Sequence, residues 1–253
     1  MTSFLQNSNF FERNNPENIA KDFGTPVYVY NEKILRDRMS KVAKVITKYP
    51  YTANYSVKAN TNIHILKLAL EEGLNCDAMS VGEITLLLKA GFPVERIFFV
   101  PNNVSNDELK FALEKGVMTS LDSLSQLELF GKTCDSMNIQ PENRKCAVRI
   151  NPGVGAGHHE KVVTGGKKTK FGIAEYGIPQ IFLIAAKYNI RIAGINQHIG
   201  SLFMDPQPYL DAVKNLLRIA HDFKDLDFID FGGGYGIPYH KLDDEKDFPM
   251  EDF

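Results

Sequence analysis

The chain has 253 residues, of which 43% are hydrophobic, and this is enough for one barrel-sized domain with a sizeable buried core. Its 29 basic and 31 acidic residues almost balance, so the composition gives no sign of a polybasic surface for nucleic acid or membrane. The expected partner is a small molecule.

The cysteines and the beginning of the chain indicate a compartment. Cys76, Cys134 and Cys146 are odd in number and lack CxxC spacing, which predicts reduced bystander thiols and no disulfide framework. Residues 1–18 lack a basic start followed by an apolar stretch, so they do not resemble a signal peptide. No apolar run approaches the roughly 20 residues that span a bilayer. We therefore expect a cytoplasmic protein without a membrane partner.

In chain order, the first predicted elements are a strand at 26–30 and a helix at about 32–48, so residues 1–48 form an N-terminal part. Residues 49–253 follow as the main domain, in which short β-rich runs alternate with helical patterns. Its strands are predicted at 53–57, 74–78, 97–100, 117–121, 146–150, 190–198 and 228–231. Its helices are predicted at 63–70, 81–90, 105 onward with a Glu108 capping box, 123–137, 178–188 and 209–223.

This alternation predicts an α/β fold with a parallel sheet, a (β/α)8 TIM-like barrel of which about seven strands are present. The acidic residues 242–253 offer no eighth strand, so we expect the barrel to be incomplete before its last strand. An open doubly wound sheet is the alternative, because it tolerates any strand number. A long polar loop at 151–172 interrupts the pattern, and loops of this length are often functional.

The first chemical signal is the segment 55–60, Tyr-Ser-Val-Lys-Ala-Asn. Lys58 ends an otherwise apolar strand, where partial desolvation favours the neutral amine that forms an imine with a carbonyl cofactor. A solvated lysine at a strand end is the structural alternative.

The second signal is the segment 231–236, Phe-Gly-Gly-Gly-Tyr-Gly, directly after a predicted strand. Gly232, Gly233 and Gly234 permit backbone amides to approach a phosphate closely, although tight turns also use glycine for steric reasons. A Walker loop is not indicated, because no Gly-Lys-Ser or Gly-Lys-Thr follows.

The third signal is the segment 197–201, Gln-His-Ile-Gly-Ser, at another strand end. The His198 imidazole could stack on an aromatic cofactor and the Ser201 hydroxyl could donate to a phosphate, while a buried structural histidine is the alternative. Nearby, residues 158–160 read His-His-Glu, but adjacent side chains point apart and the i, i+4 spacing is missing, so no metal site is expected.

Together these motifs resemble the fold-type III decarboxylases that depend on pyridoxal 5'-phosphate (PLP), whose N-terminal domain is an alanine racemase-like barrel. The resemblance extends over nearly the whole chain. It implies that Lys58 forms the imine with PLP, that His198 stacks on the pyridine ring, and that Ser201 and residues 232–234 contact the phosphate. It also implies that Asp77, Glu83 and Arg149 line the cofactor pocket.

Within the family, segments 151–159 and 170–172 are most similar to the branch that converts meso-2,6-diaminopimelate to L-lysine. The resemblance further implies a homodimer and a C-terminal β domain, which has no counterpart here. The Glu-Pro-Gly-Arg segment, the catalytic cysteine and a late tyrosine of the family are likewise missing, so the activity of these 253 residues alone is open. Ornithine or arginine decarboxylation, a non-catalytic PLP-binding homologue and a Schiff-base aldolase are the alternatives.

Overall fold

The computed structural model describes residues 10–12, 14–45, 47–155, 165–166 and 169–237. Its strands are β1 (Asn54–Ser56), β2 (Asn75–Ala78), β3 (Ile97–Phe99), β4 (Met118–Leu121), β5 (Lys145–Asn151), β6 (Ile173–Ala174), β7 (Arg191–Asn196) and β8 (Phe228–Asp230). The α-helices are α2 (Pro16–Phe23), α3 (Glu32–Ala43), α4 (Ile63–Glu71), α5 (Val81–Ala90), α6 (Asn106–Lys115), α7 (Leu124–Ser136), α8 (Ile178–Tyr188) and α9 (Gln207–Ala220). All seven strands predicted for the main domain are present.

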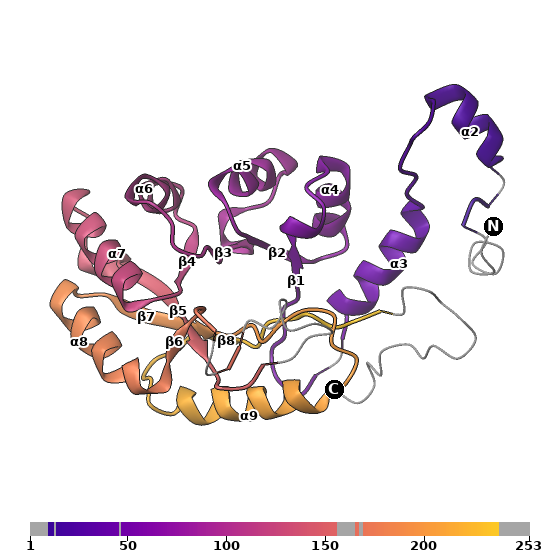
Figure 1. Cartoon of the computed structure of the whole chain (residues 1–253). Helices are drawn as coiled ribbons and strands as arrows, with labels where there is room; N and C mark the ends of the chain where they lie inside the picture. Colours follow the sequence, from indigo (N-terminus) through magenta and orange to yellow (C-terminus); the bar gives the residue numbers. More distant parts are fainter. Residues whose placement is uncertain (1–9, 13, 46, 156–164, 167–168, 238–253) are drawn as a thin grey trace.

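The order of the strands distinguishes the two predicted architectures. Every pairing is parallel, and the path β1-β2-β3-β4-β5-β7-β8 follows the chain, with the short β6 joined to β5 beside it. A doubly wound sheet would reverse its strand order at a switch point and carry helices on both faces. Here helices α4 to α9 follow the outside of a curved row of strands (Figure 1). The arrangement is therefore that of a (β/α) barrel, and the doubly wound alternative is wrong.

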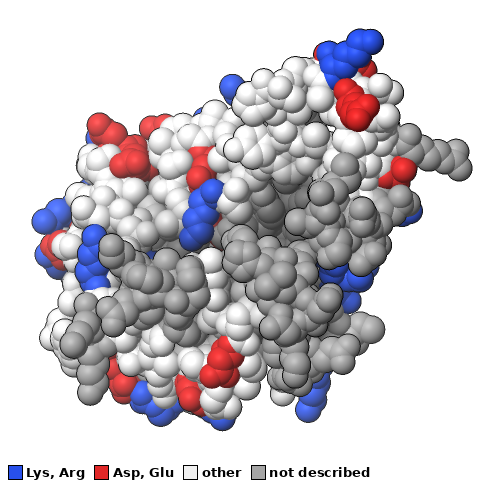
Figure 2. Space-filling model, turned by 45° about the vertical axis from the view of Figure 1, so that its right-hand side comes forward, with Lys and Arg blue, Asp and Glu red and all other residues white. Residues whose placement is uncertain are grey.

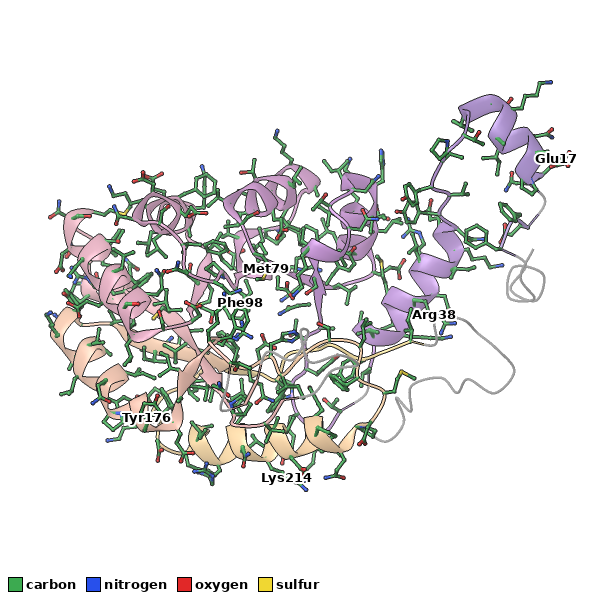
Figure 3. The ribbon with its side chains drawn as sticks, viewed as in Figure 1. Glu17, Arg38, Met79, Phe98, Tyr176 and Lys214 are labelled. Atoms are coloured by element: carbon green, nitrogen blue, oxygen red, sulfur yellow. The ribbon has the colours of Figure 1, made fainter. Side chains whose placement is uncertain are left out.

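Contacts across the inside of the curve show that the sheet encloses an interior. The rings of Phe98 on β3 and Phe228 on β8 meet edge to face, with centroids 5.3 Å apart, and Figure 3 shows Phe98 on the inner side of the strands. Gly194 on β7 makes room for this contact, since a Cβ there would lie 2.3 Å from the Phe228 ring. Ser120 on β4 donates a hydrogen bond of 2.6 Å to Asn196 on β7. Among the described residues no pairing joins β8 to β1, so the sheet forms an open barrel.

Local signals in the sequence explain where several helices begin and end. Ser80 and Ser123 accept hydrogen bonds from the backbone of the first turn, and Ser105 forms the expected capping box with Glu108. Gly91 and Gly116 end their helices in the left-handed conformation. The helices then pack on the outer face of the strands in two large apolar clusters, one along α4 to α6 and one along α7 to α9. Cys76, Cys134 and Cys146 are free and buried, as expected.

The N-terminal part differs from the prediction. Residues 27–30 are extended but belong to no strand, and Tyr28 and Tyr30 are exposed. The alternating apolar pattern was therefore misleading, because no described strand lies beside it to supply hydrogen bonds. The helix predicted to reach residue 48 ends at Ala43, where Lys44 leaves the helical dihedral region. Helix α2, with Asn15 as its N-cap, was not predicted.

The surface of the described residues is mixed in charge. Figure 2 shows Lys and Arg side chains interspersed with Asp and Glu side chains on the face it presents. None of the described helices has both the length and the apolar character needed to cross a bilayer.

Candidate active site

The residues singled out by the sequence gather at the carboxyl ends of β1, β2, β5, β7 and β8, the edge at which barrel enzymes place their catalytic groups. Lys58 lies in the single 3-10 turn Val57–Ala59 directly after β1. Its side chain is exposed, so the expected desolvation is absent in this structure. The reason is that β1 is one end of the strand path, with a described neighbour on one side only.

Asp77 lies next to this lysine, at the end of β2. Both of its carboxylate oxygens accept from the Ser56 hydroxyl, at 2.9 and 2.8 Å. The pKa of Asp77 is raised to about 6, mainly by burial and in part by the negative charges of Asp230 and Glu83, against the lowering effects of the Ser56 hydrogen bond and the Lys58 charge. Glu83 itself accepts a 2.6 Å hydrogen bond from the Met79 backbone. Asp77 therefore changes its charge closer to neutral pH than an ordinary aspartate does.

Arg149 comes from β5 and is 5% exposed. Its guanidinium donates to the side chain of Asn102 at 3.0 Å and to the His198 carbonyl at 3.3 Å, and it lies 5.1 Å from the ring centroid of Phe171. Burial lowers its pKa, and the charges of Asp122 and Asp230 act in the opposite direction. An arginine remains protonated under such conditions, so Arg149 keeps its positive charge next to the His198 backbone.

His198 follows β7 and is half-buried. Its pKa is lowered to about 4, first by burial and then by the positive charges of Lys58 and Arg149, while a hydrogen bond to the backbone of Gly233 opposes the shift. The imidazole is therefore neutral at pH 7 and presents an uncharged aromatic face. Lys58 belongs to the first predicted motif and Gly233 to the second, and both affect the pKa of His198, which belongs to the third. The three motifs therefore meet at His198.

The triple-glycine segment after β8 is packed tightly on the segment after β7. Gly232 and Gly234 have positive φ angles of 72° and 114°, and a Cβ at either one would lie 2.3 Å from the Gln197 carbonyl oxygen or 2.0 Å from that of Gly200. Glycine is thus required at both positions. At Gly233, by contrast, a Cβ would meet no atom of the described residues within 4 Å. The middle glycine is therefore the one of the three that is not packed against the described part of the chain.

Backbone hydrogen bonds hold these two segments together. Phe203 donates to the Gly234 carbonyl at 3.2 Å, and Gly236 donates to the Phe203 carbonyl at 2.8 Å. Ser201 is half-buried in the turn that leads to Phe203. The predicted phosphate-contacting residues therefore lie on adjoining turns.

Sequence reasoning missed two residues at this site. Asp230 accepts a 2.8 Å hydrogen bond from the Gly232 backbone, and the Asp-x-Gly pattern, typical of an Asx turn, could have revealed it. Tyr209, on α9, donates to the Gly232 carbonyl at 3.3 Å, and no local pattern marks that contact. Residues 158–160, which were not expected to bind metal, lie outside the described residues. A cavity of about 470 Å³ at the N-terminal helices is lined by Phe10, Tyr30 and Arg36, and by none of the residues singled out from the sequence.

Comparison with known proteins agrees with this geometry. Residues 32–251 match the family described as pyridoxal-dependent decarboxylase, pyridoxal binding domain. The chain belongs to this family. PLP is therefore the cofactor of the domain, and the recognition made from the three motifs is confirmed.

Relatives of this pyridoxal-binding domain include diaminopimelate decarboxylases. The one from Methanothermobacter thermautotrophicus is 40% identical over 93% of the chain, and the one from Staphylococcus aureus is 32% identical over 92%. The chain spans 55% of the length of each of these relatives. The crystal structure of diaminopimelate decarboxylase from Helicobacter pylori complexed with L-lysine superposes with a TM-score of 0.85 and 30% identity, covering 94% of this chain and 60% of that one.

Proposed function

We propose that this chain is the PLP-binding part of a decarboxylase that converts meso-2,6-diaminopimelate to L-lysine. The observation that carries the proposal is the convergence of Lys58, His198 and the triple-glycine turn at one end of the open barrel. The names of the relatives support the substrate, since those with 32–40% identity are diaminopimelate decarboxylases.

The residues present fit PLP in both charge and shape. The open space over Gly233 can admit a phosphate, and the adjoining turns offer backbone amides together with the Ser201 hydroxyl. The neutral His198 ring offers a flat face for the pyridine ring, and Lys58 offers the amine that holds the aldehyde carbon covalently. Asp77, Glu83 and Arg149 complete the pocket. The negative charge of Glu83 raises the pKa of Asp77, and Arg149 donates a hydrogen bond to the His198 carbonyl.

When bound, PLP supplies an electron sink for the pair left on the substrate carbon as carbon dioxide departs. His198 fixes the plane of the bound ring, which orients the bond to be broken and contributes to rate through orientation. Lys58 would hold the cofactor aldehyde through its amine, and its position in a solvent-accessible turn leaves that amine within reach of a substrate. Asp77, with its raised pKa, can hold a proton close to the Lys58 amine near pH 6.

Covalent labelling tests the cofactor site directly. We expect borohydride treatment of the PLP-loaded protein to reduce the link to Lys58, so that mass spectrometry finds a pyridoxyl adduct on the peptide containing it. Replacing Lys58 with Ala should abolish the adduct, and replacing Lys214, which points outward from α9 (Figure 3), should leave it unchanged. An adduct that persists in Lys58→Ala would refute the assignment.

Release of carbon dioxide from meso-diaminopimelate, ornithine and arginine separates the remaining alternatives. We expect turnover of meso-diaminopimelate by the protein that carries this domain. Turnover of ornithine or arginine instead would show that the protein acts on a different substrate of the same family. Lys58 labelling without turnover of any of the three would indicate a non-catalytic PLP-binding homologue.

Assembly, domain division and location belong to the same proposal. We infer a cytoplasmic homodimer in which residues 1–48 precede the PLP-binding barrel of residues 49–253. The family resemblance supports a site completed at a subunit interface, and the exposed Lys58 side chain is consistent with such completion. Light scattering of the purified protein should give the mass of two chains, and the mass of one chain would refute the dimer.

A further inference from the structure

The first glycine of the triple-glycine turn is held at both of its backbone polar groups. Its N–H donates to the Asp230 carboxylate at 2.8 Å. Its carbonyl accepts from the Tyr209 hydroxyl at 3.3 Å. One partner is two residues away in sequence and the other is 23 residues away, on the first turn of α9. Gly232 is therefore tied both to its own strand and to a neighbouring helix.

Tyr209 is itself firmly placed. It is 6% exposed, its ring stacks on that of Phe203 with centroids 5.7 Å apart, and the Tyr235 ring meets it edge to face at 5.3 Å. Its hydroxyl is also hydrogen-bonded to that of Tyr235. This hydrogen bond raises the pKa of Tyr209 and lowers that of Tyr235, so Tyr209 is the hydroxyl of the pair that retains its proton. Burial raises the pKa of Tyr209, so the hydroxyl remains a donor over the physiological range of pH.

The Tyr209 contact determines where the next amide points. The peptide bond between Gly232 and Gly233 is planar and trans, because the one cis peptide in the described residues is Thr25–Pro26. In a trans peptide the carbonyl and the following N–H point in opposite directions. With the Gly232 carbonyl held toward Tyr209, the Gly233 N–H points away from α9. Of the three glycines in the turn, Gly233 is the one at which a Cβ would meet no described atom within 4 Å.

We infer that Tyr209 is a positioning residue for the cofactor phosphate. Its hydroxyl holds the Gly232 carbonyl and thereby directs the Gly233 amide toward the phosphate. This inference rests on the proposed function, in which the triple-glycine turn binds the phosphate of PLP. A carbonyl that is already fixed lowers the entropy lost when the anion binds.

The variant Tyr209→Phe removes one oxygen and retains the ring that stacks on Phe203. Tyr188→Phe is the matched control, because Tyr188 is also buried and donates a 2.6 Å hydrogen bond, in its case to Glu128 between α7 and α8. Pyridoxal, which lacks the phosphate, serves as the second ligand. Dissociation constants of PLP and pyridoxal are measured by absorbance titration of the parent chain and of each variant.

We expect Tyr209→Phe to weaken PLP binding about five- to twentyfold and pyridoxal binding less than twofold, because a hydrogen bond that orients a charged ligand's contact is lost. Tyr188→Phe should change neither by more than about twofold. An unchanged PLP affinity in Tyr209→Phe, or equal weakening of PLP and pyridoxal, would overturn the inference while leaving the proposed function intact.

Failure of the proposed function gives a different result, because the parent chain would then bind neither ligand and Lys58 would carry no adduct. Thermal melting establishes that each variant is folded. Should Tyr209→Phe fail to fold, Tyr235→Phe decides the question. It removes the hydroxyl that supports Tyr209, and we expect it to weaken PLP two- to threefold relative to pyridoxal. An unchanged ratio there would overturn the inference.

Discussion

The two ends of the open barrel prepare the site to different degrees. At the β1 end, Lys58 is exposed in a single 3-10 turn, and the nearby Asn60 is held by hydrogen bonds with the hydroxyls of Tyr55 and Tyr30. At the β7 and β8 end, the turns are locked together by backbone bonds and by contacts so close that a Cβ could not enter. Among the described residues, the turns proposed to bind the phosphate are thus closely packed, whereas the amine of Lys58 is not enclosed.

Under the proposed function, anchoring of the phosphate and the chemistry at the amine would depend on different ends of the domain. The β7 and β8 end needs a rigid turn, since a phosphate is gripped by several amides held in one geometry. The β1 end needs an amine that can exchange its covalent partner, and a tightly packed amine would do so poorly.

Replacing Lys58 with Ala separates the two ends most directly. We expect the covalent adduct to fall to background and decarboxylation to be lost, because no other described residue at this end offers an amine. The noncovalent affinity for PLP should fall by no more than about a hundredfold, or roughly 3 kcal/mol, since the phosphate turn is untouched. Fluorescence titration with PLP measures this. Complete loss of binding would show that the two ends act as one.

Alanine substitutions at Gly234 and Gly233 test how rigid the β7 and β8 end is. Gly234→Ala forces a Cβ against the Gly200 carbonyl at a φ of 114°, and we expect it to lower the free energy of unfolding by about 2–4 kcal/mol. Gly233→Ala is the control, because its Cβ enters open space and should alter stability by less than about 0.5 kcal/mol. Urea denaturation measures both.

The same pair also separates stability from binding. The Gly233 methyl group would occupy the space proposed for the phosphate, so Gly233→Ala should bind PLP weakly although it is as stable as the parent. Normal PLP affinity in Gly233→Ala would place the phosphate elsewhere, and equal stability of the two variants would contradict the locked turn.

Asp77, between the two ends, links folding to pH. Its pKa rises from 3.8 in an ordinary carboxyl to about 6 in the folded chain, so the folded state binds the proton more tightly than the unfolded state. The carboxyl then opposes folding increasingly as pH rises from about 4 to about 6. Asp77→Asn removes this effect and can still accept from Ser56. We expect its advantage in unfolding free energy over the parent to grow by about 1–3 kcal/mol between pH 4 and pH 7.

Urea denaturation at several pH values measures the Asp77 effect, and Asp227 is the control of opposite sign. Arg191 holds the pKa of the exposed Asp227 below its usual range, so that carboxylate stabilises the folded state above its unfolded pKa. Asp227→Asn should be slightly less stable than the parent at pH 7. A parallel pH profile for Asp77→Asn and the parent would contradict the raised pKa.

The sequence predicted the architecture well because the signals involved are local. Short β-rich runs alternating with helical patterns located all seven main strands, and Ser105 with Glu108 marked a helix start that the structure reproduces. Lys58 and His198 could be recognised because each lies at the end of a strand. In a parallel sheet wound in one direction, the strand ends meet at the same edge without further information.

What the sequence could not predict depends on contacts between distant segments. Residues 26–30 have the pattern of a strand, but a strand needs a partner that no local pattern reveals. Tyr209 shares a buried helix face with Ala212 and Leu216, so it looks like an ordinary core residue. Only the packing of α9 beside β8 shows its hydroxyl on the Gly232 carbonyl. The exposure of Lys58 likewise follows from its place at the end of the strand path.

The buried side chain of Gln197 lies within the β7 and β8 end. Gln197 is 1% exposed, and within the described part of the chain both polar atoms of its side chain lack a hydrogen-bond partner. Its backbone meanwhile packs on Gly232 and donates to the Asp230 carbonyl. A buried amide without partners opposes folding, so a methionine of similar volume should increase the free energy of unfolding by about 1–2 kcal/mol.

Gln126 is the matched control for this change. It is also buried, and its side-chain oxygen lacks a partner, but its Nε2 donates to the Val104 carbonyl at 3.1 Å. Gln126→Met should therefore bring no gain, because it leaves a carbonyl unsatisfied. Urea denaturation compares the two variants, and PLP titration shows whether the Gln197 amide serves the site. A Gln197→Met protein that is more stable yet binds PLP normally would mean that the backbone alone, and not this side chain, prepares the β7 and β8 end.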